Sequence, residues 1–538
     1  MRPEDKYFYD LTEEELWQRY CGFLDLSVDE FIAMQNELLM DEIEQVADST
    51  LGKKIMNNQK PKSVEEFRRT VPLTTYDDYE PYLSERQEDA LAIKPRKWCH
   101  SAGRGGRFKW IPLSSQFVEK IAKDGLSCFI LGSTQQKGRI NLSPGFRFLS
   151  MLPPPPYASG VFLQSFAENV SFQCIPPLEA AKNMGFQERS QKAFQEALKD
   201  GVDVIGSLSS VLAKIGESFG TRSRGKKFSR SMLNPKVVLR LIRALLRAKR
   251  NKRAILPKDL WPTKAIIVGG VDTDIYRADI IRYWGSAPYE FYVCAEGFFM
   301  AVQSWNRKGM VFLPDSVFFE FIPYEQLDHL EDEDYKPSTV LLNELEEGRL
   351  YEVVITQFYG MPLLRYRMHD VIKVIALRDD ETQVNLPHII IQRRVGETID
   401  LAGLAKLDEK TIWQAIASSG IKYTEWSACK EYAQNKSFLR LYLELKEQKE
   451  ATEVATMIDK QLRIVDTDYK DIDSYLDLQL VRVRLLTPGT FERYRDDKVK
   501  EGADLAHLKP AHVNAPDAVI QRLLQLSEVG RANGESSQ

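Results

Sequence analysis

Apolar residues recur along the chain with two different spacings, which predict its helices and strands. Residues 31–47 carry them at helical intervals, and Ser63 with Glu66 three positions later is a pattern that begins helices. Between about 96 and 393 the apolar residues form short runs of strand length, separated by helical stretches and glycine turns. Several runs are apolar throughout, which is typical of strands covered on both faces. The sequence therefore predicts an α/β body with strands at 264–270, 289–296, 316–322, 351–358 and 371–377.

A second unit is predicted after Arg393, where the order of the elements changes. Length alone favours more than one unit, because 538 residues exceed what a single hydrophobic core usually supports. We expect this second unit to be a compact α+β one, with a frayed polar tail after Gly530. The pattern predicts its helices at 408–419, 451–465 and 516–526, and its strands at 437–446 and 478–486.

The charge balance excludes a general nucleic-acid binder. The 73 basic and 77 acidic residues give a net charge of −4, whereas such binders are normally basic over a whole domain. The acidic amino terminus lacks the apolar core of a secretory signal, and no run of about 18 apolar residues predicts a membrane span. The 6 cysteines form no CxxC pair and the 6 histidines show no zinc-binding spacing. We therefore expect a reduced cytoplasmic protein without stable membrane insertion, and we favour a monomer.

A strongly basic helix is predicted after Asn234 and Pro235, which form a typical cap and first-turn pair. The default interpretation is a solvated basic face over a packed apolar stripe. Contact with an anionic carrier, an acidic lipid or another partner is the alternative. The basic face consists of Lys236, Arg240, Arg243, Arg247 and Arg250, opposite Val238, Leu241, Ile242 and Leu245.

The segment SAGRGGRFKWIP at 101–112 is the most informative local pattern. Its three glycines allow backbone conformations that other residues avoid, so several N–H groups can turn toward one point and cradle phosphate oxygens. Basic side chains within and after the loop add positive charge. A plain surface turn is the alternative interpretation of the segment alone. The residues concerned are Ser101, Ala102, Gly103, Arg104, Gly105 and Gly106, with Lys109 just beyond.

Three further charged residues could contribute to binding a phosphate-bearing ligand. Glu296 ends a predicted strand, where a carboxylate suits Mg²⁺ beside phosphates, although an edge glutamate paired with an arginine fits as well. Asp370 could accept two hydrogen bonds from a vicinal diol such as ribose, or could pair with Arg365 or Arg367. Lys509 follows a Pro-Gly turn and could neutralise charge on an attacked phosphate, or could be an ordinary surface lysine.

Six segments, in order, resemble the Gretchen Hagen (auxin-responsive promoter) family of acyl-acid amido synthetases, which belongs to the adenylate-forming superfamily. The match spans nearly the whole chain. The segments are FRRTVPLTTYDDYEPYL (67–83), the loop at 101–112, DLWPTKAIIVGG (259–270), YVCAEGFF (292–299), GMPLLRYRMHDV (360–371), and TPGTF (487–491) with the later HLKP (507–510).

The resemblance implies that the chain forms two domains with different functions. Residues 1–393 would form a large adenylate-forming domain of mixed sheets and helices that binds nucleotide and acyl substrate. Residues 394–397 would be a hinge, and 398–538 a small α+β lid domain. ATP and Mg²⁺ would be required, and a small carboxylic acid and an amine, usually of an amino acid, would be the substrates.

The resemblance also implies roles for individual residues. The glycine-rich loop and Lys109 would contact the ATP phosphates, Glu296 would hold Mg²⁺, and Lys509 would assist catalysis from the lid. Asp370 would bind the ribose. The adenine pocket would be bordered by Gly269 and Gly270, and Tyr292 and Ala295 would contribute from the motif that contains Glu296.

The chain departs from the family pattern at five positions. Hydroxyl residues are usual where the loop has Ala102, Arg104 and Gly105. Serine is usual at Ala295 and glycine at His369. These departures leave two alternatives to an amido synthetase open, namely an acyl-CoA-type ligase and a catalytically silent protein that keeps the fold for binding.

Overall fold

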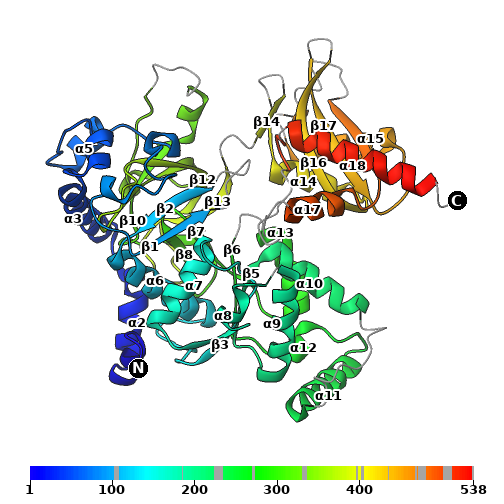
Figure 1. The fold of residues 1–538 in the computed structure, drawn as a ribbon, viewed down its shortest axis with the longest axis horizontal. Coiled ribbons are helices and arrows are strands. Elements are labelled where there is room, and N and C mark those ends of the chain that lie inside the picture. The colour runs from blue at the N-terminus through cyan, green and yellow to red at the C-terminus, as the bar shows by residue number, and fades with distance from the viewer. Residues whose placement is uncertain are drawn as a thin grey trace. The chain divides into compact units, whose positions relative to one another are not determined.

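A mixed sheet forms the centre of the first part of the chain in the computed structural model (Figure 1). Strands β4, β3, β5, β6 and β7 are parallel neighbours, whereas β7 pairs antiparallel with β8, β8 with β9, β10 with β11 and β11 with β12. Among the residues that the structure describes, the sheet has 11 strands, which lie in the order β10 (Val317–Pro323), β11 (Leu350–Gln357), β12 (Tyr366–Ala376), β13 (His388–Arg394), β9 (Met310–Phe312), β8 (Phe298–Gln303), β7 (Tyr289–Cys294), β6 (Ala265–Gly269), β5 (Val204–Leu208), β3 (Phe146–Ser150) and β4 (Phe172–Ile175).

The chain divides into two compact units, Met1–Gln392 and Arg393–Gln538. The five strands predicted for the body are all present, as β6, β7, β10, β11 and β12. The predicted fold class, a large α/β part and a smaller α+β part, is confirmed. The structure describes residues 1–101, 108–184, 186–222, 234–269, 273–329, 336–394, 398–401, 405–433, 436–466, 469–470, 480–500, 512–515 and 517–535.

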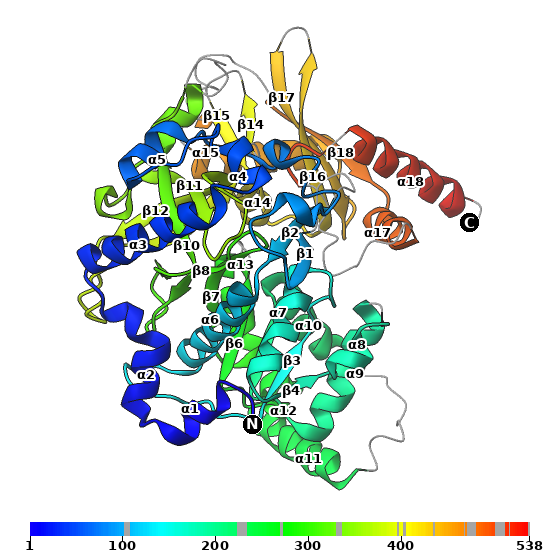
Figure 2. The ribbon, with the colours of Figure 1, turned by 60° about the vertical axis from the view of Figure 1, so that its left-hand side comes forward.

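Helices surround this sheet, and α3 lies across its β10 end (Figure 2). Gln35 of α3 holds that position, because its side chain donates to the Val317 carbonyl at 2.7 Å and accepts from the Phe319 N–H at 2.9 Å. The helices of the first unit are α1 (Asp5–Asp10), α2 (Glu13–Cys21), α3 (Val28–Val46), α4 (Thr50–Ile55), α5 (Val64–Thr70), α6 (Ser115–Ser133), α7 (Ala158–Asn169), α8 (Leu178–Ala181), α9 (Phe186–Asp200), α10 (Ser209–Arg222), α11 (Pro235–Arg250), α12 (Pro257–Leu260) and α13 (Thr273–Trp284).

Ser63 caps helix α5 as the sequence predicts, since its side chain accepts from the Glu66 N–H at 3.2 Å. The reciprocal half of the predicted pair is different, because the Glu66 carboxylate accepts from the backbone of Lys62 at 2.8 Å. A complete reciprocal cap instead begins α3, between Ser27 and Glu30. Each such cap satisfies N–H groups that the first helical turn leaves unpaired.

The second unit is built on a three-stranded sheet in the order β16-β17-β18. The predicted helices and strands are present, but the sequence pattern did not reveal β16 or α17. The tail expectation was wrong, because α18 continues past Gly530 to Glu535. The elements are β14 (Thr398–Leu401), β15 (Ala405–Asp408), α14 (Glu409–Ser418), β16 (Tyr423–Ala433), β17 (Lys436–Leu445), α15 (Ala451–Val465), β18 (Val481–Leu486), α17 (Thr490–Lys500) and α18 (Asp517–Glu535).

The basic helix α11 begins at the predicted cap, and most of its basic face is exposed as expected. The predicted apolar stripe is wrong in most of its members, because Leu241 packs against the core whereas the other three residues are exposed. Asn234 accepts from the Lys236 N–H at 3.0 Å. Two residues expected in the packed stripe, Ile242 and Leu245, are instead 47% and 55% exposed. The physical reason is that α11 packs through its small residues, such as Ala244, which allow close approach to its neighbours.

No helix within the described parts of the chain is long and apolar enough to cross a membrane.

Candidate active site

A two-stranded antiparallel hairpin presents Lys109 at the start of its second strand. The hairpin consists of β1 (Lys97–Ser101) and β2 (Lys109–Leu113), and Ser101 lies opposite Lys109 in its register. The glycine-rich loop that joins the strands, with Ala102, Gly103, Arg104, Gly105 and Gly106, lies outside the described residues. The two ends of that loop are therefore fixed by strand pairing, and Lys109 stands at one of them.

Two tyrosines hold the Lys109 ammonium. Its Nζ donates to the Tyr366 hydroxyl at 3.1 Å and lies 5.5 Å from the centre of the Tyr76 ring. The Tyr76 hydroxyl is tied to the same hairpin, since it accepts from the Trp110 N–H at 2.8 Å and donates to the Trp110 carbonyl at 3.1 Å. The ring faces attract the cation, so Lys109 is directed toward β12, the strand that carries Asp370.

Tyr292 and Asp370 meet although 78 residues separate them, and the Tyr292 hydroxyl donates to Asp370 Oδ2 at 2.7 Å. Both strands are irregular at these points. The register of β7 against β8 shifts between Tyr292 and Val293, and that of β11 against β12 shifts opposite the segment that contains Asp370. Bulges re-aim side chains, and they are frequent beside active sites. The pairing therefore depends on two local departures from regular sheet geometry.

A buried carboxylate, Glu352 on β11, holds the irregular segment of β12. It accepts from Arg367 Nε at 3.0 Å and Nη2 at 2.7 Å, and from the His369 backbone N–H at 3.3 Å. Burial alone would raise the pKa of Glu352, but hydrogen bonds from the side chains of His369, whose Nδ1 lies 3.3 Å from Glu352 Oε1, and of Arg367 outweigh it and lower that pKa. His369 has φ of 59°, in the left-handed region that favours glycine, which gives a physical reason for the usual glycine at this position.

Glu296 follows β7 and is 5% exposed. Gln357 fixes its backbone by donating to the Glu296 carbonyl at 2.6 Å. The charge of the Glu296 carboxylate acts on two nearby groups, Cys294 on β7 and Tyr76 beside Lys109. Burial, then the charge of Glu296, and also that of Asp370 raise the pKa of the Cys294 thiol, and burial with nearby carboxylates including Glu296 raises the pKa of Tyr76 to about 12.

The described structure thus brings four of the predicted site residues into one region, namely Lys109, Tyr292, Glu296 and Asp370. Ala295 is buried beside them in the chain, and Gly269 ends β6. Gly270, Lys509 and hinge residues 395–397 lie outside the described residues.

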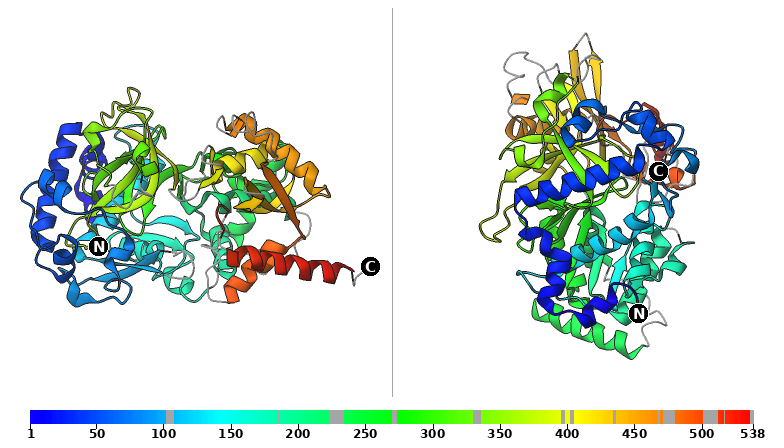
Figure 3. Two further views of the ribbon diagram at one scale, coloured as in Figure 1. Left: turned by 90° about the horizontal axis from the view of Figure 1, so that it is seen from above. Right: turned by 90° about the vertical axis from the view of Figure 1, so that its left-hand side faces the viewer.

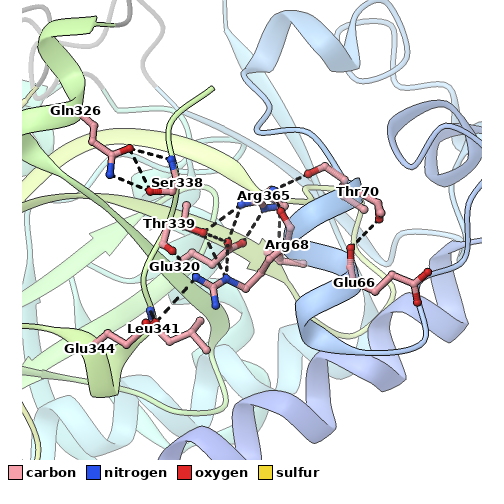
Figure 4. A network of polar contacts seen from close by, with 12 residues as sticks. Glu66, Arg68, Thr70, Glu320, Gln326, Ser338, Thr339, Leu341, Glu344 and Arg365 are labelled. Carbon is pink, nitrogen blue, oxygen red and sulfur yellow. Dashed lines mark hydrogen bonds and ion pairs between the residues drawn. The ribbon is translucent and has the colours of Figure 1, made fainter. Parts of the chain in front are cut away.

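The arginines that could have paired with Asp370 have other partners. Arg365 donates to Glu320 through Nε at 3.0 Å and Nη2 at 2.8 Å, and these two side chains are almost fully buried (Figure 4). Arg367 donates to Glu352 in the same two-pronged way. Local sequence favoured an Arg–Asp pair, yet the buried glutamates of β10 and β11 accept both guanidinium groups.

Sequence reasoning missed three residues that organise this site: Tyr76, Glu352 and Tyr366. Tyr366 stands in the 360–371 segment and Tyr76 in the 67–83 segment, so both lie within segments that carry the family resemblance. Glu352 had no such signal, because an isolated glutamate in an apolar run does not reveal which strand will pair beside it.

Comparison with known proteins places these segments in one family. Residues 22–169 match the GH3 family N-terminal domain, residues 310–388 the central domain and residues 410–516 the C-terminal domain. Indole-3-acetic acid-amido synthetase GH3.17 of Arabidopsis thaliana is 21% identical over 559 residues, covering 89% of this chain and 90% of that protein. Jasmonoyl--L-amino acid synthetase GH3.5 of Oryza sativa subsp. japonica is 25% identical over 304 residues, covering 51% of this chain and 50% of that protein.

Solved structures share the fold. The acyl acid amido synthetase AtGH3.15, in complex with 2,4-DB, superposes with a TM-score of 0.67 at 17% identity and covers 96% of both chains. A 2-hydroxyisobutyryl-CoA ligase in the postadenylation state superposes with a TM-score of 0.61 at 13% identity, covering 93% of this chain and 92% of that one. At these identities the likeness concerns architecture, so the chemistry must be argued from the side chains.

Proposed function

The chain belongs to the GH3 family, and from this premise we propose that it is an acyl-acid amido synthetase. It activates a small carboxylic acid with ATP and joins the acyl group to an amine, in particular that of an amino acid. The relatives with this activity support the proposal, and no narrower acid or amine follows from their names.

The hydrogen bond between Tyr292 and Asp370 carries the proposal. It holds one carboxylate oxygen of Asp370, so that the carboxylate is oriented to accept from the hydroxyls of a ribose. Lys109, directed toward the same strand by Tyr366, supplies positive charge for phosphate oxygens at the hairpin turn. One nucleotide can satisfy both groups, because its sugar and phosphates carry the complementary chemistry.

The proposed reaction has two steps. An oxygen of the substrate carboxylate attacks the α-phosphorus of ATP, the bond to the β-phosphate oxygen breaks, and acyl-AMP and pyrophosphate form. The amine nitrogen then attacks the acyl carbon, the bond to AMP breaks, and the nitrogen loses a proton to give the amide. The protein contributes positioning and charge stabilisation to both steps.

A magnesium ion fits the proposed site. Glu296 offers a buried carboxylate within electrostatic reach of Tyr76, and Mg²⁺ is commonly held by one or two carboxylates together with substrate phosphates. No group of three or more candidate ligands occurs among the described residues, so the phosphates would complete the coordination. When bound, the ion would neutralise phosphate charge.

The remaining site assignments belong to the same proposal. The loop residues Ser101–Gly106 contact phosphates, Gly269 and Gly270 border the adenine, and Ala295 lines the nucleotide pocket. Lys509 acts from residues 398–538, a lid joined to the larger domain by a hinge at 394–397. A cytoplasmic location is part of this proposal and agrees with the 6 free thiols.

The proposal is tested by acid-dependent exchange of labelled pyrophosphate into ATP, over a panel of aromatic, aliphatic and hydroxy acids. Lys109→Ala and Lys509→Ala should each reduce the exchange at least tenfold. Lys308→Ala is the matched control, because Lys308 is 68% exposed in its side chain, pairs with Glu381 on the surface and should leave the exchange unchanged.

The second half-reaction separates the alternatives. Products should form when amino acids are added, and coenzyme A should not replace them. Thioester formation with coenzyme A would instead identify an acyl-CoA-type ligase. Absence of ATP binding in calorimetry would identify a protein that keeps the fold without catalysis.

A further inference from the structure

Helix α11 has three distinct faces, of which one packs against the protein. Its buried residues are small, including Ala244 and Ala248, and they face α9 and α12. The helix lies at the periphery of the first unit, beside α12, in Figure 1 and Figure 2, and a green helix is again at the edge of that unit in the right-hand view of Figure 3. The side chains on its other two faces are therefore presented outward.

The second face is apolar and exposed. Leu245 is 55% exposed and Leu246 is 63% exposed, values that are high for leucines in a folded protein. At 100° per residue the members of this face fall within one continuous sector of the helix. They are Val238, Leu239, Ile242, Leu245 and Leu246, each at least 40% exposed.

The third face is basic, and no acidic residue of α11 itself offsets its charge. The exposed basic residues of this face are Lys236, Arg243, Arg247 and Arg250, and no ion pair within the described parts of the chain involves any of them. Exposed cations without acidic partners leave this side of the helix attractive to anions.

An open groove joins the basic and apolar faces. It lies between α11, the end of α9 and α12. Basic residues of its walls, among them Lys199, Lys236 and Arg243, outnumber the two acidic ones, Asp200 and Asp259, and the apolar Leu239 lies beside them. Arg240 is occupied elsewhere, since its Nη1 donates to the Ala197 carbonyl at 2.9 Å and so secures the end of α9. Arg247 also has a structural role, since its Nη1 donates to the Asp259 carbonyl at 3.3 Å. No hydrogen bond within the described residues engages the side chains of Lys199, Lys236 or Arg243, which line the groove together with Leu239.

We propose that α11 docks the protein on an anionic phospholipid membrane. An interfacial helix needs an apolar face that enters the acyl boundary, with cations beside it that meet anionic headgroups, and α11 has both on adjacent sectors. A nucleic acid would leave the aliphatic side chains unsatisfied. A second copy of this chain would bring two unneutralised basic faces together, so the charge on the helix favours a negatively charged bilayer.

The proposal is independent of the enzymatic activity, and it is tested on the full chain by vesicle co-sedimentation. We expect at least tenfold more binding to phosphatidylcholine vesicles that contain about one third phosphatidylserine than to phosphatidylcholine alone, and a decrease with added salt. The double variant Leu245→Ser with Leu246→Ser should lose at least tenfold of this binding. Arg243→Gln with Arg250→Gln should weaken it and reduce its dependence on salt.

The matched control is Leu377→Ser with Ile464→Ser, because these residues are 45% and 67% exposed but lie on other elements. The control should bind like the unchanged protein, and circular dichroism should show all variants folded. Equal binding to neutral and anionic vesicles, or binding unaffected by the leucine variant, overturns the proposal. If vesicles do not bind and light scattering shows a dimer that the leucine variant abolishes, a second copy occupies this face and the membrane proposal is wrong.

Discussion

The buried carboxylate of Glu352 gives the sharpest test of how the site is held, and Glu352→Gln is the smallest change that removes its charge. Glu352 is fully buried and is the partner of Arg367 and of the His369 backbone N–H. Removing one member of a buried ion pair costs about 3–5 kcal/mol, because the other charge is left uncompensated. The glutamine retains one oxygen acceptor, so we expect about 3 kcal/mol, the lower end of that range.

This loss converts into a shift of the melting temperature. Unfolding entropy is about 2.1 cal/mol/K per residue, which for the unit Met1–Gln392 gives about 0.8 kcal/mol/K. The Tm of that unit should therefore fall by about 4 °C in Glu352→Gln, as measured by differential scanning calorimetry at pH 7. Pyrophosphate exchange, measured well below both transitions, should fall as well, because the segment that positions Asp370 loses its anchor.

The pH dependence supplies the check. The pKa of Glu352 is lowered below its ordinary value of 4.5, so its contribution is complete above pH 4.5 and is lost as the pH falls through the lower folded-state value. The difference in Tm between Glu352→Gln and the unchanged protein should therefore shrink in acid. A variant whose Tm stays within 1 °C of the unchanged protein at pH 7 would refute the reasoning.

Three further outcomes follow from single groups. Tyr292→Phe removes a hydrogen bond to the charged Asp370 and should raise the KM for ATP about tenfold in the exchange assay, with Tm little changed; an unchanged KM would exclude this role. Burial raises the pKa of Asp124 to about 6, so stability should decline as the pH rises from 3.8 to about 6, and Asp124→Asn should flatten that part of a Tm-versus-pH curve. Burial disfavours the charged form of His512, but the two flanking carboxylates favour it more strongly. They raise the pKa of His512 from 6.5 to about 9. Its stabilisation is present below pH 6.5 and lost as the pH rises through 9, and a His512→Gln variant that kept this decline in calorimetry would contradict the assignment.

Elements with a strong hydrophobic period could be predicted from the sequence, because burial decides them. The apolar run at 316–322 became β10, whose residues are almost all buried, and the helical run at 451–465 became α15 with the predicted bounds. The strand β16 escaped because charged residues such as Glu425 and Lys430 interrupt its pattern, although its pairing with β17 stabilises it. Cross-strand pairing thus determined a strand that local pattern did not indicate.

The orientation of α11 shows a second limit of sequence patterns. Helical spacing told us correctly which residues share a face, but it did not tell which face the protein buries. Large aliphatic residues such as Leu245 were expected inside, whereas Ala244 and Ala248 are the ones buried. Small side chains permit close packing of helices, and arginines can pack their long stems along a neighbouring element, so the burial of a face depends on the partner surface.

The site itself combines both cases, since its residue types could be read from motifs while their geometry could not. Asp370 was predicted from a segment rich in arginines, and a local Arg–Asp pair would have been the simplest outcome. The buried carboxylates of Glu320 and Glu352 accept those arginines instead, which leaves the bulged segment of β12 to direct Asp370 toward Tyr292. A positive φ at a histidine within that bulge is tolerated because Glu352 binds the backbone N–H of the same residue. Charges buried on β10 and β11 therefore determine where the ribose-binding candidate points, and that information becomes available only once the strands are assembled into the sheet.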